Sequence, residues 1–147
     1  MNPLNPFQIA LVESSFRKIH RHADEAAALF FTRLFEFDPV LRRTADGDMQ
    51  QQKRFFVKLL GTVVHRLECF DLVRDYIREI ATTHPHLSLR DEHHHTVGAA
   101  FFWMLEEILG AEFTPETYGA WMAIFRALSI ETKQAVGDLE SSTALAC

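Results

Sequence analysis

The sequence predicts an all-α protein, because its apolar residues recur at helical spacing along nearly the whole chain. Apolar residues three and four positions apart share one face of a helix, whereas a half-buried strand alternates every second residue. Runs with that alternation are hard to find here, and only 6 of the 147 residues are Gly. A chain of this length can bury one sizeable core. We therefore expect one domain over residues 1–147, with a core over about residues 6–137 and a frayed tail over residues 138–147.

Capping residues and apolar stripes divide the chain into six substantial helices and one short helix. Asn, Asp and Thr are good N-cap residues, and Pro suits the first helical position. Such a pair opens the first, third and last helices, at Asn5-Pro6, Asp38-Pro39 and Thr114-Pro115. The expected helices cover residues 6–20, 23–37, 39–43, 49–67, 72–84, 91–109 and 115–137.

Composition and charge exclude several classes of protein. The formal net charge is −5, which favours neither nucleic acid nor an anionic membrane as a partner. No stretch reaches the roughly 18 consecutive apolar residues that a membrane span needs. Cys69 and Cys147 are too few for a disulfide framework, and we expect both to stay reduced. The N-terminus lacks the pattern of a signal peptide, so we expect a cytoplasmic protein.

His84 ends the apolar face of the helix expected over residues 72–84, where its imidazole points toward the core. The face consists of Val73, Tyr76, Ile77, Ile80 and Ala81. A histidine in this position is either hydrogen-bonded to backbone or a ligand to a metal or haem, and this helix alone favours the first reading. Pro85 disfavours the helical conformation at the preceding residue, so the helix should end at His84.

Gln52 begins the apolar face of the preceding helix, four residues before Phe56. If the faces of the two helices oppose each other, the imidazole and the amide lie on opposite walls of one gap. Haem needs that arrangement, because one imidazole nitrogen binds iron while the other is hydrogen-bonded and fixes the ring. The amide can then donate a hydrogen bond to dioxygen. Taken alone, Gln52 is better explained as a partly exposed residue in the first turn of a helix.

Other polar clusters in the sequence carry weaker signals. His93, His94 and His95 are consecutive on a helix and point about 100° apart, so they do not bind one metal ion together. Only His94 continues the apolar face of its helix. The carboxylates form no di-iron pattern, and there is no phosphate-binding loop or nucleophile motif.

Five segments, in order, resemble the globin domain of flavohaemoglobins, as it occurs in bacterial single-domain haemoglobins. The resemblance covers about residues 7–136 and implies a globin fold, with six to seven helices packed around a haem pocket. The segments are FFTRLFEFDPVLR at 30–42, QKRFFVKLLGTVVHRLE at 52–68, IATTH at 80–84, HHTVGAAFFWMLEEILG at 94–110 and FTPETYGAWMAIFRALS at 113–129.

The resemblance implies that the chain binds haem b and gives individual residues their roles. His84 is the proximal ligand of the haem iron, Gln52 is the distal amide, and Phe56 is the apolar residue above the iron. Phe31 stands where these globins usually have a tyrosine that hydrogen-bonds the gas, so we expect faster dioxygen loss than in a Tyr/Gln pocket. The other residues expected to contact haem are Phe55, His94, Val97 and Phe101.

Three further departures from the family pattern bear on the chemistry. The glutamate that polarises the proximal histidine is Val136 here, which weakens the expectation of peroxidase-like activity. The tyrosine beside that histidine is His94. The phenylalanine that usually wedges the haem is not evident, since Thr44 or Ala45 falls there. A haem-free sensor or interaction domain of globin fold therefore stays open, as does distal iron ligation by Met49, Lys53 or His65.

The function implied is reversible binding of O2, with NO as a second candidate ligand. We expect a binding protein rather than an enzyme. A chain of this length is expected to carry no flavin reductase, so NO dioxygenation would need an external reductase. The sequence separates neither storage from scavenging or sensing, nor a monomer from a homodimer.

Overall fold

The computed structural model describes the backbone of residues 2–44, 48–83 and 91–146, and their side chains except those of 42–44, 91–94 and 135–146. This part of the chain contains seven α-helices and a short 3-10 helix, and it contains no strand. The all-α prediction is therefore confirmed. The helices are α1 (Pro6–Arg21), α2 (Ala23–Phe37), α3 (Pro39–Thr44), α4 (Met49–His65), α5 (Phe70–Thr83), α6 (Asp91–Leu109), η2 (Gly110–Glu112) and α7 (Pro115–Ala146).

The predicted helix starts are confirmed by their capping hydrogen bonds. Asn5 Oδ1 accepts from the backbone N–H of Gln8 at 2.8 Å, while the Gln8 side chain accepts from the N–H of Asn5 at 3.0 Å. Asp38 Oδ1 accepts from the N–H of Val40 at 3.2 Å at the start of α3. At the start of α7, Thr114 Oγ1 accepts from the N–H of Thr117 at 3.2 Å. Each bond satisfies a donor that a helix terminus would otherwise leave without a partner.

Three predicted helix limits are wrong. The helix α4 ends at His65 rather than at residue 67, and α5 begins at Phe70 rather than at residue 72. Phe70 is buried and continues the apolar face of α5, which explains its place in the helix. The helix α7 continues to Ala146, past the end predicted near Gly137. One glycine costs a helix only about 1 kcal/mol relative to alanine, and no proline follows it.

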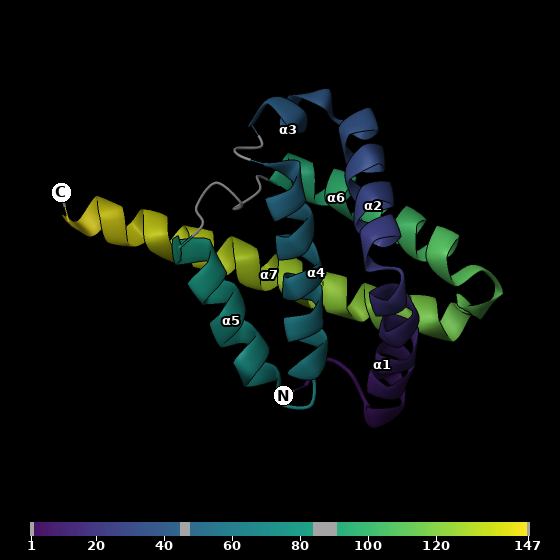
Figure 1. Cartoon of the computed structure of the whole chain (residues 1–147). Coiled ribbons are helices and arrows are strands. Elements are labelled where there is room, and N and C mark those ends of the chain that lie inside the picture. The colour runs from purple at the N-terminus through teal and green to yellow at the C-terminus, as the bar shows by residue number, and fades with distance from the viewer. Residues whose placement is uncertain (1, 45–47, 84–90, 147) are drawn as a thin grey trace.

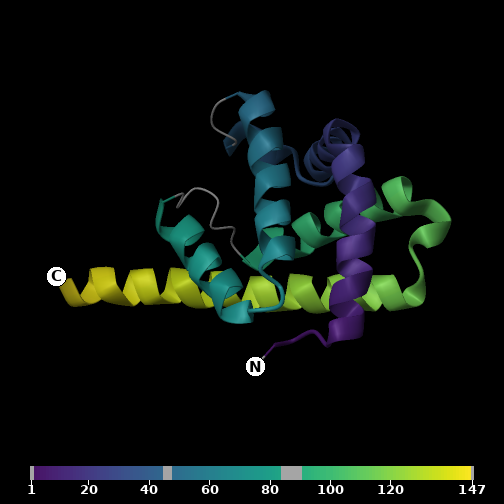
Figure 2. The same cartoon turned by 60° about the horizontal axis from the view of Figure 1, so that its bottom comes forward.

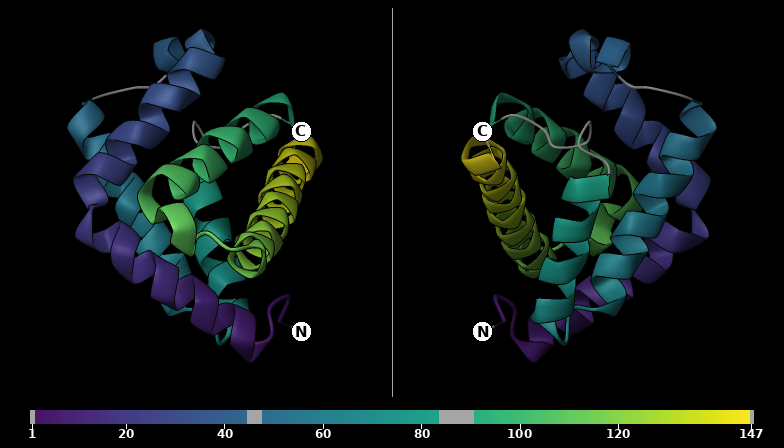
Figure 3. Two further views of the ribbon diagram at one scale, coloured as in Figure 1. Left: turned by 90° about the vertical axis from the view of Figure 1, so that its right-hand side faces the viewer. Right: turned by 90° about the vertical axis from the view of Figure 1, so that its left-hand side faces the viewer.

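The helices α6 and α7 run antiparallel, and α1, α2 and α4 cross this pair (Figures 1 and 3). The helix α5 packs chiefly against α7 and is joined to α4 by a short turn (Figure 2). From that turn α4 and α5 diverge, so the first turn of α4 and the last turn of α5 lie on the same side of the molecule (Figure 2).

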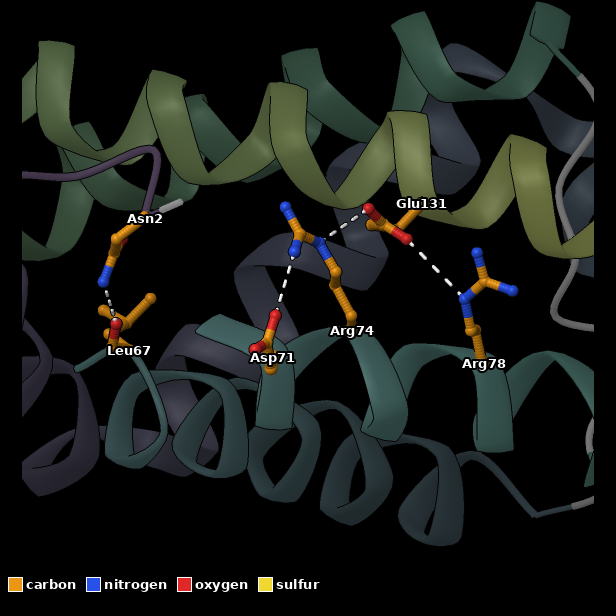
Figure 4. Close-up of polar contacts among 6 residues, drawn as sticks. All are labelled: Asn2, Leu67, Asp71, Arg74, Arg78 and Glu131. Carbon is orange, nitrogen blue, oxygen red and sulfur yellow. Dashed lines mark hydrogen bonds and ion pairs between the residues drawn. The ribbon is translucent and has the colours of Figure 1, made fainter. Parts of the chain in front are cut away.

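Two short contacts support this arrangement. Gly98 of α6 lies against α7, where a Cβ atom would come within 2.8 Å of Cζ of Phe125. Asn2 Nδ2 donates to the carbonyl of Leu67 at 2.6 Å, which ties the N-terminal segment to the turn between α4 and α5 (Figure 4). A larger residue at position 98 would require the Phe125 ring or one of the two helices to move.

Candidate functional site

Gln52 lies in the first turn of α4, as the sequence predicts. Asp48 caps this turn, because its Oδ1 accepts from the N–H of Gln50 at 3.0 Å and its carbonyl accepts from the N–H of Gln52 at 3.2 Å. Gln52 and Phe56 are four residues apart and therefore share one face of the helix. Both side chains are partly exposed. The amide and the ring are thus presented together on one wall.

Aromatic rings from three helices meet around Phe56, and we call Phe30, Phe31, Phe56 and Phe101 the phenylalanine cluster. Phe56 stacks on Phe30 with ring centroids 4.4 Å apart and planes 9° from parallel. Phe31 lies edge-on to Phe56 at 5.9 Å, and Phe101 does so at 6.4 Å. Three of the predicted contact residues, Phe31, Phe56 and Phe101, are therefore brought together from α2, α4 and α6.

The phenylalanine cluster is supported from behind by a hydrogen-bonded tryptophan. Trp121 of α7 lies edge-on to Phe101 at 5.5 Å and is buried. Its Nε1–H donates to Ser15 Oγ at 2.8 Å, and that hydroxyl donates to the carbonyl of Val12 at 3.0 Å. A buried polar group that is fully paired in this way holds its neighbours in one arrangement. The inner wall of the predicted site is therefore rigid.

Several apolar side chains of α2, α4, α5 and α6 keep some contact with water. They pack against the core, but each is only partly buried. Exposed apolar surface costs about 25 cal/mol per Å² relative to burial, so an apolar group that covers it is stabilised. These residues come from four helices and are Phe31, Phe56, Leu59, Tyr76 and Val97. The residues present therefore fit a flat apolar group held by several helices.

Of the remaining predicted site residues, the structure describes the side chain of Phe55 but neither His84 nor the side chain of His94. Phe55 is partly exposed and projects about 100° away from its neighbour Phe56 around α4. His84 and the side chain of His94 lie outside the described residues, as do the side chains of Thr44 and Val136. The helix α5 is described to Thr83, the residue directly before His84. The predicted helix end at His84 and its contact with iron stay predictions.

An open pocket of about 390 Å³ lies between α2, α3 and the first turns of α4. It shares Phe31 with the predicted site and includes neither Gln52 nor Phe56. Met49 and Lys53, which the sequence left open as distal iron ligands, both line this pocket. The lining residues are Ala28, Phe31, Thr32, Phe35, Glu36, Pro39, Met49 and Lys53.

Two negative findings hold for the described part of the chain. No group of three or more His, Cys, Asp or Glu side chains there could hold a metal ion. None of its helices is both long enough and apolar enough to cross a membrane.

An ion cluster that was not predicted from the sequence joins α5 to α7. Arg74 Nε donates to Glu131 Oε1 at 3.1 Å, and Arg78 Nε lies 3.8 Å from Glu131 Oε2 (Figure 4). Arg74 Nη1 also pairs with Asp71 Oδ1 at 3.0 Å. The side chain of Glu131 is only 10% exposed. Two signals were available: Glu131 follows Leu128 by three residues on the apolar face of its helix, and the arginines are one turn apart.

Comparisons with known proteins agree with this architecture. A family model described as Globin matches residues 22–131. The flavohemoprotein of Bordetella pertussis is 28% identical over 129 residues, which cover 86% of this chain and 32% of that protein. Flavohemoprotein B of Dictyostelium discoideum is 23% identical over 141 residues, which cover 95% of this chain and 33% of that protein. The chain thus spans about a third of the length of these curated relatives.

Proposed function

This chain belongs to the globin family, and from that premise we propose that it binds haem b and reversibly binds O2. Haem supplies an iron centre that holds a diatomic gas. The observation that carries the proposal is the phenylalanine cluster, whose members Phe31 and Phe56 are only partly buried, with Gln52 one turn before Phe56 on α4. Similarity to flavohemoproteins over 86% of the chain supports the same cofactor.

In this proposal His84 binds the haem iron through one imidazole nitrogen and is oriented by a hydrogen bond at the other. Gln52 donates an amide hydrogen bond to the gas. Phe56 and Phe31 cover the distal side and keep water away from it. The remaining contacts with the flat group come from Phe55, His94, Val97 and Phe101.

The residues around this site favour gas binding over peroxide chemistry. Val136 offers no carboxylate to polarise His84, so the electron push that favours O–O cleavage is weak. NO is the second candidate gas. Its dioxygenation would need electrons from a separate reductase, since no reductase activity is proposed for this chain. Storage, delivery, scavenging and sensing all depend on the same binding step.

The rival function is a haem-free sensor or interaction domain of globin fold. It is favoured by one observation, namely that Thr44 or Ala45 stands where relatives of the resembled type have a haem-wedging phenylalanine. The phenylalanine cluster argues against this rival function. Partly exposed apolar rings next to an amide donor are explained by a bound apolar group that covers them, and an empty site would leave them in contact with water.

An absorbance scan separates the two functions. We expect purified protein supplied with haem to show a Soret band, and we expect His84→Ala to lose it. His20→Ala is the matched control, because His20 is an exposed histidine in the last turn of α1. Far-ultraviolet circular dichroism checks that both variants keep their helices. A colourless wild-type protein after haem supplementation would overturn the proposal.

A further inference from the structure

The position of α5 along α7 is weakly determined by apolar contacts alone. The buried face of α5 consists of Phe70, Val73, Ile77 and Ala81. Apolar burial is non-directional, so such a face gains similar free energy after a small displacement along its neighbour. The turn that joins α5 to α4 restrains only the N-terminal end of α5. Another interaction must fix where its C-terminal end lies.

The ion cluster of Asp71, Arg74, Arg78 and Glu131 supplies that interaction. Arg74 and Arg78 are four residues apart and share one face of α5. Each guanidinium faces a different oxygen of the same carboxylate, at 3.1 Å and 3.8 Å (Figure 4). A displacement by one helical turn, about 5.4 Å, would leave the carboxylate at most one of the two arginines, because they are themselves one turn apart. The carboxylate therefore has one best position relative to the two arginines.

Burial of Glu131 strengthens the preference of its carboxylate for the position between the two arginines. Among the described side chains, Glu131 is the one charged group that is buried. A buried carboxylate is costly unless it is paired, so an arrangement of α5 that removed the arginines would be disfavoured. Arg74 is itself held in place by Asp71 at 3.0 Å and by the ring of Phe70, whose centroid is 5.1 Å from its guanidinium carbon.

We propose that Glu131 is a positioning residue that fixes the register of α5 on α7 and so sets where the iron ligand after α5 is presented. The second half of this inference rests on the proposed role of His84. Thr83, the last residue of α5, is five residues after Arg78, or about 7.5 Å along the helix axis. A helix of this length is stiff, and a shift at Arg78 is passed on to its end.

The test separates position from stability. Glu131→Leu removes the charge but keeps an apolar volume, and removal of one member of an ion pair is strongly destabilising only where the other is left buried without a partner. Arg74 and Arg78 are 36% and 47% exposed and can turn to water. We therefore expect an unchanged or higher Tm in Glu131→Leu, together with amide hydrogen exchange in α5 that is at least about tenfold faster. Asp75→Asn, which removes an exposed carboxylate in the middle of α5 itself, is the control and should change neither quantity.

A second readout concerns the iron. In the ferrous haem-loaded protein, we expect Glu131→Gln to shift or broaden the iron–histidine stretching band, seen by resonance Raman spectroscopy, while the Soret band is kept. Arg74→Ala should cause a smaller shift of the same kind, because Arg78 still contacts Glu131. The double variant Arg74→Ala with Glu131→Gln should match Glu131→Gln alone.

The two proposals fail in different ways. If His84→Ala keeps its haem spectrum, the proposed ligand is wrong, whereas the register of α5 is still judged by hydrogen exchange. If exchange in α5 is unchanged in both Glu131 variants, or changes only as far as Tm does, the positioning role is overturned. If the haem spectrum depends on His84 but the iron–histidine band is unchanged in Glu131→Gln, then Glu131 does not set where the iron ligand is presented, and that part of the proposal is overturned.

Discussion

At the scale of single residues, Phe31 is where the distal side differs most from the pattern of the family that the sequence resembles. Its ring is packed edge-on to Phe30 at 5.1 Å and to Phe56 at 5.9 Å. A phenylalanine offers no hydrogen-bond donor, so the proposed distal donor is the amide of Gln52. The site is thus predicted to hold O2 with one fewer hydrogen bond than a Tyr/Gln pair provides.

Phe31→Tyr tests this difference. A net neutral hydrogen bond is worth about 0.5–1.5 kcal/mol, so the added hydroxyl should slow O2 dissociation roughly 2- to 13-fold. Stopped-flow displacement of O2 measures the rate. Phe35→Tyr makes the same chemical change one turn later in α2, beside the open pocket, and should leave the rate unchanged. Equal effects of the two variants would contradict the assignment of Phe31 to the distal side.

Gln52→Ala tests the remaining donor. We expect O2 to dissociate roughly 2- to 13-fold faster, for the same energetic reason. Gln50→Ala is a close control, because Gln50 is an exposed amide in the same helical turn. An off-rate in Gln52→Ala that equals the wild-type value would show that the distal assignment is wrong.

At the scale of helices, sequence signals determined the starts better than the ends. Helix starts carry their own chemistry, as Asn5, Asp38 and Thr114 show by capping. The end of α7 carries no such chemistry, since Gly137 alone does not stop a helix whose following residues still favour it. The ion cluster was not predicted, because it pairs residues 57 positions apart, and nothing local to Arg74 indicates which residue of α7 it meets. The phenylalanine cluster was predicted in part, because Phe30, its stacked member, was not among the predicted site residues.

The crossing of α6 and α7 yields a stability prediction. Gly98→Ala places a methyl group 2.8 Å from Cζ of Phe125, where the ring of Phe125 or one of the two helices must shift. Overpacking of this kind costs about 1–3 kcal/mol, which urea unfolding monitored by circular dichroism would measure. At Gly119, a Cβ atom meets nothing within 4 Å. Gly119→Ala should therefore raise the stability by up to about 1 kcal/mol. A Gly98→Ala variant as stable as wild type would mean that α6 and α7 are not held at this spacing.

At the scale of the whole molecule, α7 is the element to which three others are attached, each by a different interaction. Trp121 joins it to α1 by a hydrogen bond to Ser15. Phe125 faces Gly98 of α6 by close steric contact. Glu131 joins it to α5 through charge. These attachments lie within about three turns of one helix. The helices that form the proximal and distal walls of the proposed site are therefore positioned relative to each other by α7.

The buried indole gives the protein an optical reporter of its own. The chain has 2 Trp residues. Trp103 lies on α6 beneath the guanidinium of Arg33, 4.8 Å from its carbon, whereas Trp121 is buried between Ser15 and the phenylalanine cluster. Emission from Trp121 therefore originates beside the proposed site, where a haem would accept its excitation energy. Loading of the site and integrity of the contact between α1 and α7 can both be followed by the intensity and the wavelength of that one fluorophore, without any added label.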